Sequence, residues 1–445
     1  MSTRLGAVRY TVLLALGTTG FDPHAGADET LRIDLPTALR LADERNLDVA
    51  IYYERVAAAS AALTQARLLA VPTIRVGSSY DRHEGTIQET SGLVVDADRA
   101  SRFVGVGAGV GIDIADAIFQ PLAARQSLEA VRASADANRH QVLVEVATAY
   151  LRLLQAHAEA GVIDGALERA TDLATLTGSY AEAGEGLLAD AQMAAVQPLL
   201  WQQRQLAANE NIEAATAAVT QLLHLEIGVT IEPTEDAIPT LELFPVDGDL
   251  QTLIARALDG RPEREQLDAL VASAEEDLKA QRYGIFIPSV SVNYQSGDFG
   301  GGPGSDIANT DHRDDLTLQL YWQLEGFGFG HRARVEAKQA QLRAIGLERD
   351  KLHDAIVAEV RSAFASTRSR RSQLPLADDA VARASEAYAL HRERIYDQQG
   401  LPLEALAAML SFANAELARI DAVVSYDLAQ IRLHTALGNP LEVEP

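Results

Sequence analysis

The sequence predicts a mainly α-helical chain of two structural repeats, each of which combines long coiled-coil helices with one β-hairpin of a transmembrane β-barrel. Three observations predict this fold class. Similar motifs recur at a nearly constant offset along the 445 residues. Four short segments alternate apolar and polar residues with the period of a strand, and other segments have helical periodicity over unusual lengths.

The composition limits the classes of protein to which the chain can belong. Lys and Arg number 38 against 63 Asp and Glu, and the net charge of −25 argues against nucleic-acid binding, which needs a basic surface. The lack of cysteine excludes disulfides, thiolate metal sites and an acyl anchor on an N-terminal cysteine. Only 5% of the residues are aromatic, and a core of Ala, Leu and Val suits closely packed long helices.

Residues 1–27 are predicted to be a secretory signal peptide. A short basic region with Arg4 and Arg9 precedes an apolar stretch at 10–20, which is too short to span a bilayer as a helix. The A-G-A motif at 25–27 fits the A-x-A cleavage pattern. No later segment has 18 uninterrupted apolar residues, so we expect an exported protein that enters a membrane only through strands.

The two halves of the chain repeat the same order of motifs. The motif P-T-I-R-V at 72–76 matches P-S-V-S-V at 288–292, and a Gly-plus-acid motif at 186–190 matches another at 400–404. Chance similarity between Ala-rich helices would not preserve this order. The predicted organisation is a signal peptide (1–27), a first repeat (28–228) with a hairpin at 72–114, an inter-repeat linker (229–250), a second repeat (251–438) with a hairpin at 288–325, and a C-terminal tail (439–445).

The longest segments are predicted to be coiled-coil helices. From Val142 to Ala174 a 4–3 spacing places an apolar residue at every seam position, and residues 374–395 repeat the pattern less regularly. The segment from Pro121 to Gly184 alone would form about 95 Å of helix at 1.5 Å per residue. A helix of this length is typical of an intermolecular bundle or a tube.

Some positions should interrupt or bend the helices. We expect breaks at Arg45–Asn46 and at Arg261–Pro262, which stand at matching places in the two repeats. Pro198 and Pro375 lie inside helical patterns and are expected to kink them, because proline removes a backbone hydrogen bond.

The alternating segments have the length of tilted transmembrane strands, about nine to eleven residues. One face of each is apolar and the other is polar or small; the apolar positions include Ile74, Val76, Val104, Val106, Val290, Val292, Leu316, Leu318 and Leu320. The alternative is a soluble antiparallel sheet that packs on a helix. The signal peptide favours the membrane interpretation for all four segments together.

The connections between these strands favour a barrel made by several chains. Residues 81–101 and 296–315 are polar and rich in glycine, and we expect them to be loops that face the exterior. Four strands cannot close a barrel, because open edges would leave backbone groups unpaired in lipid. Three copies would give twelve strands, an even number with adequate girth.

The ordered arrangement of signal peptide, two repeats of helix, hairpin, long helix, tight turn and helix, and a Gly-plus-acid turn in each repeat resembles the TolC-like outer-membrane efflux protein family. The resemblance covers essentially all of the chain after residue 27. It implies a homotrimer in which a 12-stranded barrel in outer-membrane lipid continues into an α-helical tunnel across the periplasm. It also implies two partners, a periplasmic adaptor (membrane fusion) protein that docks on the helical tips and an inner-membrane pump.

The resemblance places adaptor docking at the two periplasmic turns, residues 184–188 and 399–403. Gly186 and Gly400 fall where the family has its turn glycine, the residue best able to adopt φ > 0. The implied docking residues are Gly184, Gly186, Leu187, Gly400 and Leu401. Pro402 departs from a polar run and could instead start the helix that follows.

Four residues beside these turns are candidates for a constriction of the tunnel. Asp190 and Glu404 fall near the family's acids, which can form a carboxylate ring that favours cations when three chains meet. The alternative is that these acids only stabilise the first turn of a helix through its macrodipole. Tyr180 and Tyr396 precede the turns and could narrow the mouth, although packing between helices is the simpler role.

No motif predicts catalysis, a cofactor or a metal site. The ten histidines include no H-E-x-x-H motif and no pair suited to zinc. The glycines at 105–111 follow G-x-G-x-G rather than the dinucleotide spacing, which favours tight packing or a smooth channel wall. The chain is not expected to be an enzyme.

The sequence therefore favours an outer-membrane exit duct of a tripartite efflux or type I secretion system, passive and driven by its pump. The alternative is a periplasmic coiled-coil structural or adaptor protein whose β segments are soluble. The sequence does not indicate the cargo.

Overall fold

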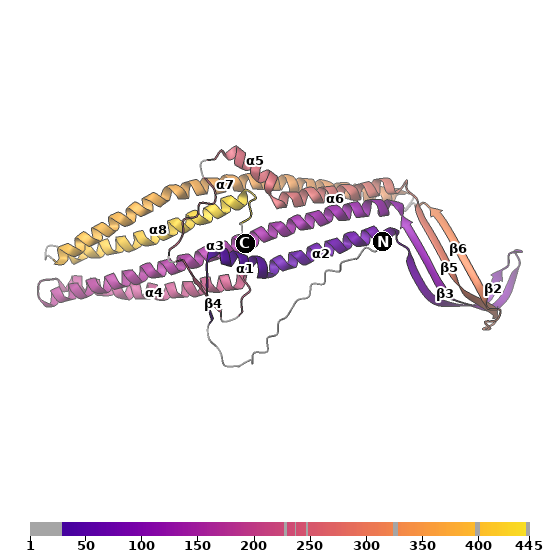
Figure 1. The fold of residues 1–445 in the computed structure, drawn as a ribbon, viewed down its shortest axis with the longest axis horizontal. Helices are drawn as coiled ribbons and strands as arrows, with labels where there is room; N and C mark the ends of the chain where they lie inside the picture. Colours follow the sequence, from indigo (N-terminus) through magenta and orange to yellow (C-terminus); the bar gives the residue numbers. More distant parts are fainter. Residues whose placement is uncertain are drawn as a thin grey trace, which may run out of the picture.

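The computed structural model describes residues 29–226, 229–235, 237–245, 248–323, 328–396 and 401–441. The molecule is elongated, with a four-stranded sheet at one end and the ends of its longest helices at the other (Figure 1). A small two-stranded sheet lies near the middle. The predicted signal peptide, Gly228 and Gly400 are outside the described residues.

Helices of the same order and similar length occur in both halves. The first half has α1 (Leu35–Arg45), α2 (Leu47–Arg67), α3 (Ile114–Glu182) and α4 (Leu188–Leu222), with a 3₁₀ turn at Leu68–Ala70. The second half has α5 (Leu250–Gly260), α6 (Pro262–Gly284), α7 (Phe329–Tyr396) and α8 (Pro402–Ala436). Because α3 and α7 contain 69 and 68 residues, the prediction of overlong helices is confirmed. None of the helices within the described ranges has a stretch long and apolar enough to cross a membrane.

Both predicted helix breaks are confirmed. Asn46 has an extended backbone, and its Oδ1 accepts hydrogen bonds from the N–H groups of residues 48 and 49 at 2.8 and 3.3 Å, which caps α2. Its Nδ2 donates to the Leu222 carbonyl at 2.9 Å, so the break is also tied to the end of α4. Arg261 is extended in the same way before Pro262, the first residue of α6.

The predicted kink positions lie inside continuous helices. α4 and α7 each continue as one helix through Pro198 and Pro375. α3 starts earlier than expected, because Asp113 at the end of a strand caps it by accepting a hydrogen bond from the Asp116 N–H at 3.0 Å. Strand and helix therefore meet without a linker.

Three buried clusters hold the helices together. The middle cluster surrounds Tyr150 of α3 and includes residues of α1, α4 and α8. A second cluster around Trp201 and Met409 lies toward the tips, and a third joins α5, α7 and α8 around Ile356. Alanines occupy many of the contact positions, so the helix backbones approach closely, as the predicted seam requires.

The larger sheet has the order β2-β3-β5-β6, with every pair antiparallel. Its strands are β2 (Thr73–Gln88), β3 (Val94–Asp113), β5 (Ser289–Pro303) and β6 (Asp311–Tyr321). The hairpins of the two repeats thus join through β3 and β5. The smaller sheet pairs β1 (Glu29–Ile33) in parallel with β4 (Val229–Pro233).

The register of the larger sheet gathers the predicted apolar positions on one face. Val292 pairs with Leu318 and with Val110, and residues that pair directly share a face. Val76 and Leu318 are 81% and 72% exposed, so the helices do not cover this face. The sheet is therefore not packed on a helix of the same chain, whereas the alternative of a soluble sheet expected such packing.

The prediction that residues 81–101 and 296–315 are loops was wrong. β2 and β3 remain paired as far as Gln88 and Val94, and β5 continues to Pro303. The apolar alternation stops earlier than the strands do, because backbone pairing itself needs no apolar face. An ion pair of 3.5 Å between Arg82 and Asp98 joins the two strands in this outer part.

Candidate functional site

The ends of α3 and α7 and the starts of α4 and α8 lie together at the end of the molecule opposite the large sheet (Figure 1). In the first turn Gly184 has φ +78°, a conformation that suits glycine because it has no Cβ. The carbonyl of Tyr180 accepts hydrogen bonds from the N–H groups of Glu185 and Gly186 at 2.9 and 3.0 Å. These bonds satisfy a backbone carbonyl in the last turn of α3.

The structure corrects the role expected for Gly186. Gly184, not Gly186, adopts the positive φ in this turn. At Gly186 a Cβ would lie 3.2 Å from the N atom of Ala181 and 3.3 Å from the Tyr180 Cβ. Gly186 lies so close to the end of α3 that a side chain would be crowded there, which explains the glycine at this position. Gly400, its counterpart, lies outside the described residues.

The starts of α4 and α8 are equivalent. Leu187 and Leu401 are the N-cap residues, with φ and ψ of −81° and 131° and of −88° and 131°. Asp190 and Glu404 each stand at the third position of the helix that follows. An acid in the first turn is favoured by the macrodipole, as the alternative interpretation expects. Pro402 is the first residue of α8, a place where its missing N–H costs nothing.

A cleft of about 510 Å³ joins the two turns. It is lined by Tyr180, Glu185, Gly186, Leu187, Asp190, Ile395, Leu401 and Pro402. The Tyr180 hydroxyl crosses it to donate a hydrogen bond to the Ile395 carbonyl at 3.2 Å. Tyr180 therefore packs between α3 and α7 within one chain. Tyr396 ends α7, and its side chain is not among those that the structure describes.

The two candidate acids have different surroundings. The Glu404 Oε2 lies 3.3 Å from the Arg394 Nη1 and 3.5 Å from the His391 Nδ1, both on α7. Asp190 lines the cleft and is partly exposed. The sequence interpretation missed Arg394 and His391, although both stand on the last turns of α7 and could have been found as bases that precede a first-turn acid.

The face of the large sheet opposite its apolar residues is polar and poor in side chains. One row across the strands contains Arg75, Gly107, Gln295 and Asp315, and the next contains Gly77, Gly105, Gly297 and Arg313. A Cβ at Gly105 or Gly297 would lie 2.7 or 2.9 Å from the Phe103 Cζ, so this ring lies over the glycine row. The glycines thus permit a flat wall, in agreement with the sequence interpretation.

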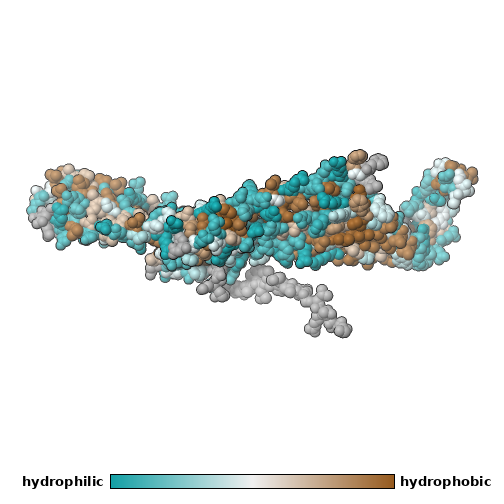
Figure 2. Space-filling model, turned by 90° about the horizontal axis from the view of Figure 1, so that it is seen from above, coloured by the Kyte–Doolittle hydropathy of each residue, from teal (hydrophilic) through white to brown (hydrophobic). Residues whose placement is uncertain are grey.

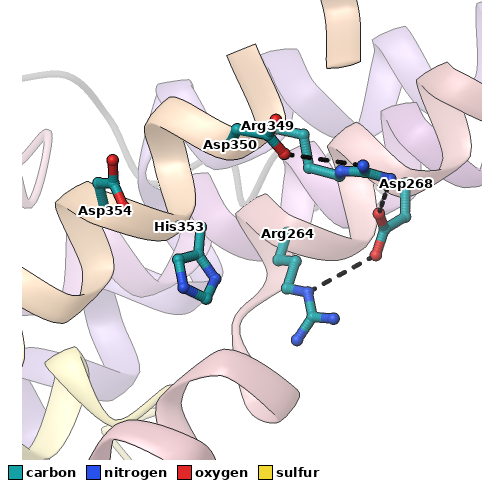
Figure 3. Close-up of a pocket in the computed structure, with 6 residues that line it drawn as sticks. All are labelled: Arg264, Asp268, Arg349, Asp350, His353 and Asp354. Atoms are coloured by element: carbon teal, nitrogen blue, oxygen red, sulfur yellow. Dashed lines mark ion pairs between the residues drawn. The ribbon is translucent and has the colours of Figure 1, made fainter. Parts of the chain in front are cut away.

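A charged hollow of about 360 Å³ lies between α6 and α7 (Figure 3). Arg264 Nε and Arg349 Nη1 lie 3.7 and 3.8 Å from the two carboxylate oxygens of Asp268, and Arg349 Nη2 lies 3.7 Å from Asp350. The hollow therefore contains an ion-pair network in which the two arginines pair with Asp268 and Asp350. Nothing in this arrangement indicates catalysis.

Comparison with solved structures identifies the class of protein that has this fold. The outer-membrane channel OprN superposes with a TM-score of 0.79 at 20% identity, over 91% of this chain and 90% of that one. The CmeC outer membrane channel of Campylobacter jejuni gives 0.76 at 16%, over 92% and 87%. The MtrE outer membrane channel of Neisseria gonorrhoeae, in an open state, gives 0.72 at 19%, over 92% and 90%. The chain therefore has the fold of an outer-membrane channel subunit.

A family model agrees with this class. Residues 253–439, most of the second repeat, match the model described as Outer membrane efflux protein. No curated protein sequence matches the chain. The resemblance to TolC-like outer-membrane efflux proteins, inferred from the order of motifs, is confirmed by this match and by the fold.

Proposed function

We propose that the protein is a passive outer-membrane exit duct of a tripartite efflux or type I secretion system. The observation that carries the proposal is the open four-stranded sheet. Its apolar face is exposed, its other face is polar and flat, and β2 and β6 are edge strands within the described sheet. An apolar face with open edges is stable in lipid only when copies of the sheet close on one another.

Three copies would close twelve strands around a polar lumen, and their long helices would continue the lumen as a tunnel in the periplasm. The helices near the sheet and the turn after α6 also have exposed apolar side chains, including Tyr283, Phe286 and Phe329. Figure 2 shows apolar surface gathered on the helical part close to the sheet. Contact with neighbouring copies would cover such surface, which supports a homotrimer.

The helical tips are the proposed docking surface for a periplasmic adaptor, which an inner-membrane pump accompanies. Leu187, Leu188 and Leu401 are 69%, 70% and 61% exposed around the cleft that joins the two turns. Exposed leucines of this kind mark a surface that a partner covers. The duct itself is not an enzyme in this proposal, and its energy comes from the pump.

Membrane fractionation, crosslinking and conductance test the proposal together. We expect the full chain in the outer-membrane fraction, a trimer band after crosslinking, and stepwise currents in planar bilayers. A monomer in the soluble periplasmic fraction after osmotic shock would instead support the coiled-coil structural or adaptor protein and would contradict the duct.

A further inference from the structure

A carboxyl group at the middle of the molecule is buried with a single hydrogen bond. Asp427 of α8 has none of its surface exposed. Its Oδ1 accepts a hydrogen bond from the Leu241 N–H at 2.8 Å, and its Oδ2 is buried without a hydrogen-bond partner among the described residues. Burial raises the pKa of Asp427 to about 7, against the smaller opposite effect of the Leu241 N–H. The ionised form has too few donors to replace its lost hydration.

A second side chain of α8 holds the same stretch of the inter-repeat linker. Gln430, nearly one turn after Asp427, accepts a hydrogen bond from the Phe244 N–H at 3.0 Å and donates to the Phe244 carbonyl at 3.2 Å. Its Nε2 also lies 2.7 Å from the Tyr426 hydroxyl. Asp427 and Gln430 therefore fix the irregular stretch 237–245 to α8.

The other end of this stretch is fixed to the first repeat. Glu235 accepts a hydrogen bond from the Leu35 N–H at 3.3 Å and contacts the Tyr150 hydroxyl of α3. Tyr150 also donates to the Ile33 carbonyl at 2.8 Å. We name Glu235 and residues 237–245 the linker clamp, since together they connect α3 of one helix pair to α8 of the other.

No neighbouring charge offsets the burial of Asp427. Titratable and charged side chains on the elements packed near it include Glu235 and Glu242 of the linker, Tyr150, Arg152 and His157 of α3, Arg256 of α5, Arg368, Arg370 and Arg371 of α7, and Tyr426 and Arg432 of α8. None is among the causes of the shifted pKa of Asp427, which are its burial and the Leu241 N–H. The pKa of Asp427 is therefore set by its burial and by the Leu241 N–H rather than by a charged neighbour.

We propose that the linker clamp is a proton-controlled connection between the two helix pairs, closed on α8 when Asp427 is protonated and released there when Asp427 ionises. This role rests on the duct proposed above, in which α3/α4 and α7/α8 form parts of one tunnel wall. The clamp then sets how firmly the two parts of the wall are joined halfway between the sheet and the tips.

The sign of the effect follows from the two pKa values of Asp427. In the released form the carboxyl group is exposed and its pKa has the ordinary value of 3.8. In the closed form its pKa is about 7. When the clamp is released at a pH between these two pKa values, one proton leaves Asp427. The equilibrium constant for release therefore rises roughly tenfold per pH unit in this range and becomes constant above the pKa of the closed form. Stability of the closed clamp is complete in acid and is lost as the pH rises toward 7.

Hydrogen exchange on the full chain in lipid nanodiscs tests this proposal. Protection of the Leu241 and Phe244 amides, corrected for intrinsic exchange, should fall roughly tenfold per unit between pH 5 and 7 and stay constant from 7 to 8. Asp427→Asn cannot ionise and keeps an Oδ1 acceptor, so its protection should not change with pH. Asp421→Asn, an exposed acid of the same helix, should keep the wild-type slope.

Protection that is independent of pH in the wild type would overturn the clamp, whether or not Asp427→Asn folds. A slope that persists in Asp427→Asn would overturn it as well, because another group would then control release. The clamp is tested by amide exchange, whereas the duct is tested by conductance. A clamp that fails in a conducting trimer is therefore distinguished from a failure of the duct itself.

Discussion

Arg394 and Glu404 form an ion pair across the turn between α7 and α8, with Nη1 and Oε2 3.3 Å apart. His391 approaches the same oxygen at 3.5 Å. Glu404 therefore acts first within its own chain, where it joins the ends of two helices. A ring of carboxylates at the tunnel mouth would have its full charge only from Asp190, because Arg394 balances Glu404.

Removal of the Glu404 charge should loosen the tip. In Glu404→Gln the attraction that holds Arg394 to the start of α8 is lost, and we expect a higher single-channel conductance in planar bilayers. The change in stability should stay below about 1 kcal/mol, because both side chains are substantially exposed to water. Asp379→Asn breaks a comparable pair with Arg383 at 2.9 Å on α7 and should leave conductance unchanged. Equal conductance in all three proteins would exclude the pair from gating.

Neutralisation of Asp190 should change ion selectivity rather than conductance. Asp190→Asn removes one carboxylate per chain from the proposed mouth, so the preference for cations should weaken. Reversal potentials in a salt gradient measure it. Asp172→Asn, which removes an exposed acid of α3, is the matched control. If the two variants have the same selectivity, Asp190 only stabilises the start of α4.

Substitution of Asn46 should destabilise the middle of the molecule. Asn46→Ala loses the cap of α2 and the hydrogen bond to Leu222 in a side chain that is 3% exposed. The expected cost is about 1–3 kcal/mol, since a buried cap is removed and the partly buried Leu222 carbonyl loses its partner. Thermal unfolding measures it, with the exposed Asn211→Ala of α4 as a control. Equal unfolding midpoints for Asn46→Ala and Asn211→Ala would contradict the role of Asn46 in linking α2 to α4.

The two faces of β6 should tolerate charge differently. Leu318→Arg places a cation on the exposed apolar face and should cost about 2–4 kcal/mol if that face meets lipid. Gln319→Arg places the same cation on the polar face, where water is expected. The amount of trimer in the outer-membrane fraction compares them. Similar amounts for both variants would count against a lipid-facing sheet.

Much of the fold was predictable because its signals are periodic and local. The alternation around Leu318 and Val292 fixed which face of the sheet is apolar, and the breaks at Asn46 and Pro262 stood at matching places in the two repeats. The full strand lengths were not predictable in this way. Beyond the apolar segment β2 and β3 are held by backbone pairing, which leaves no pattern of side chains.

The candidate site was predictable only in part. Resemblance located the two turns, but the positive φ belongs to Gly184 because the hydrogen bonds to Tyr180 decide which residue ends α3. The burial of Asp427 depends on a stretch of linker that has no regular structure. Contacts between segments so distant in sequence have no local signature.

The glycine row beneath Phe103 has a consequence for anything that moves along the polar face. Gly105 and Gly297 have no side chains, and the end of the Phe103 ring lies over them. Arg313 is the long flexible side chain of this row, and the other three positions are glycines. In the proposed duct, this row would offer little resistance to solutes of different shapes, and discrimination between them would rest with the pump.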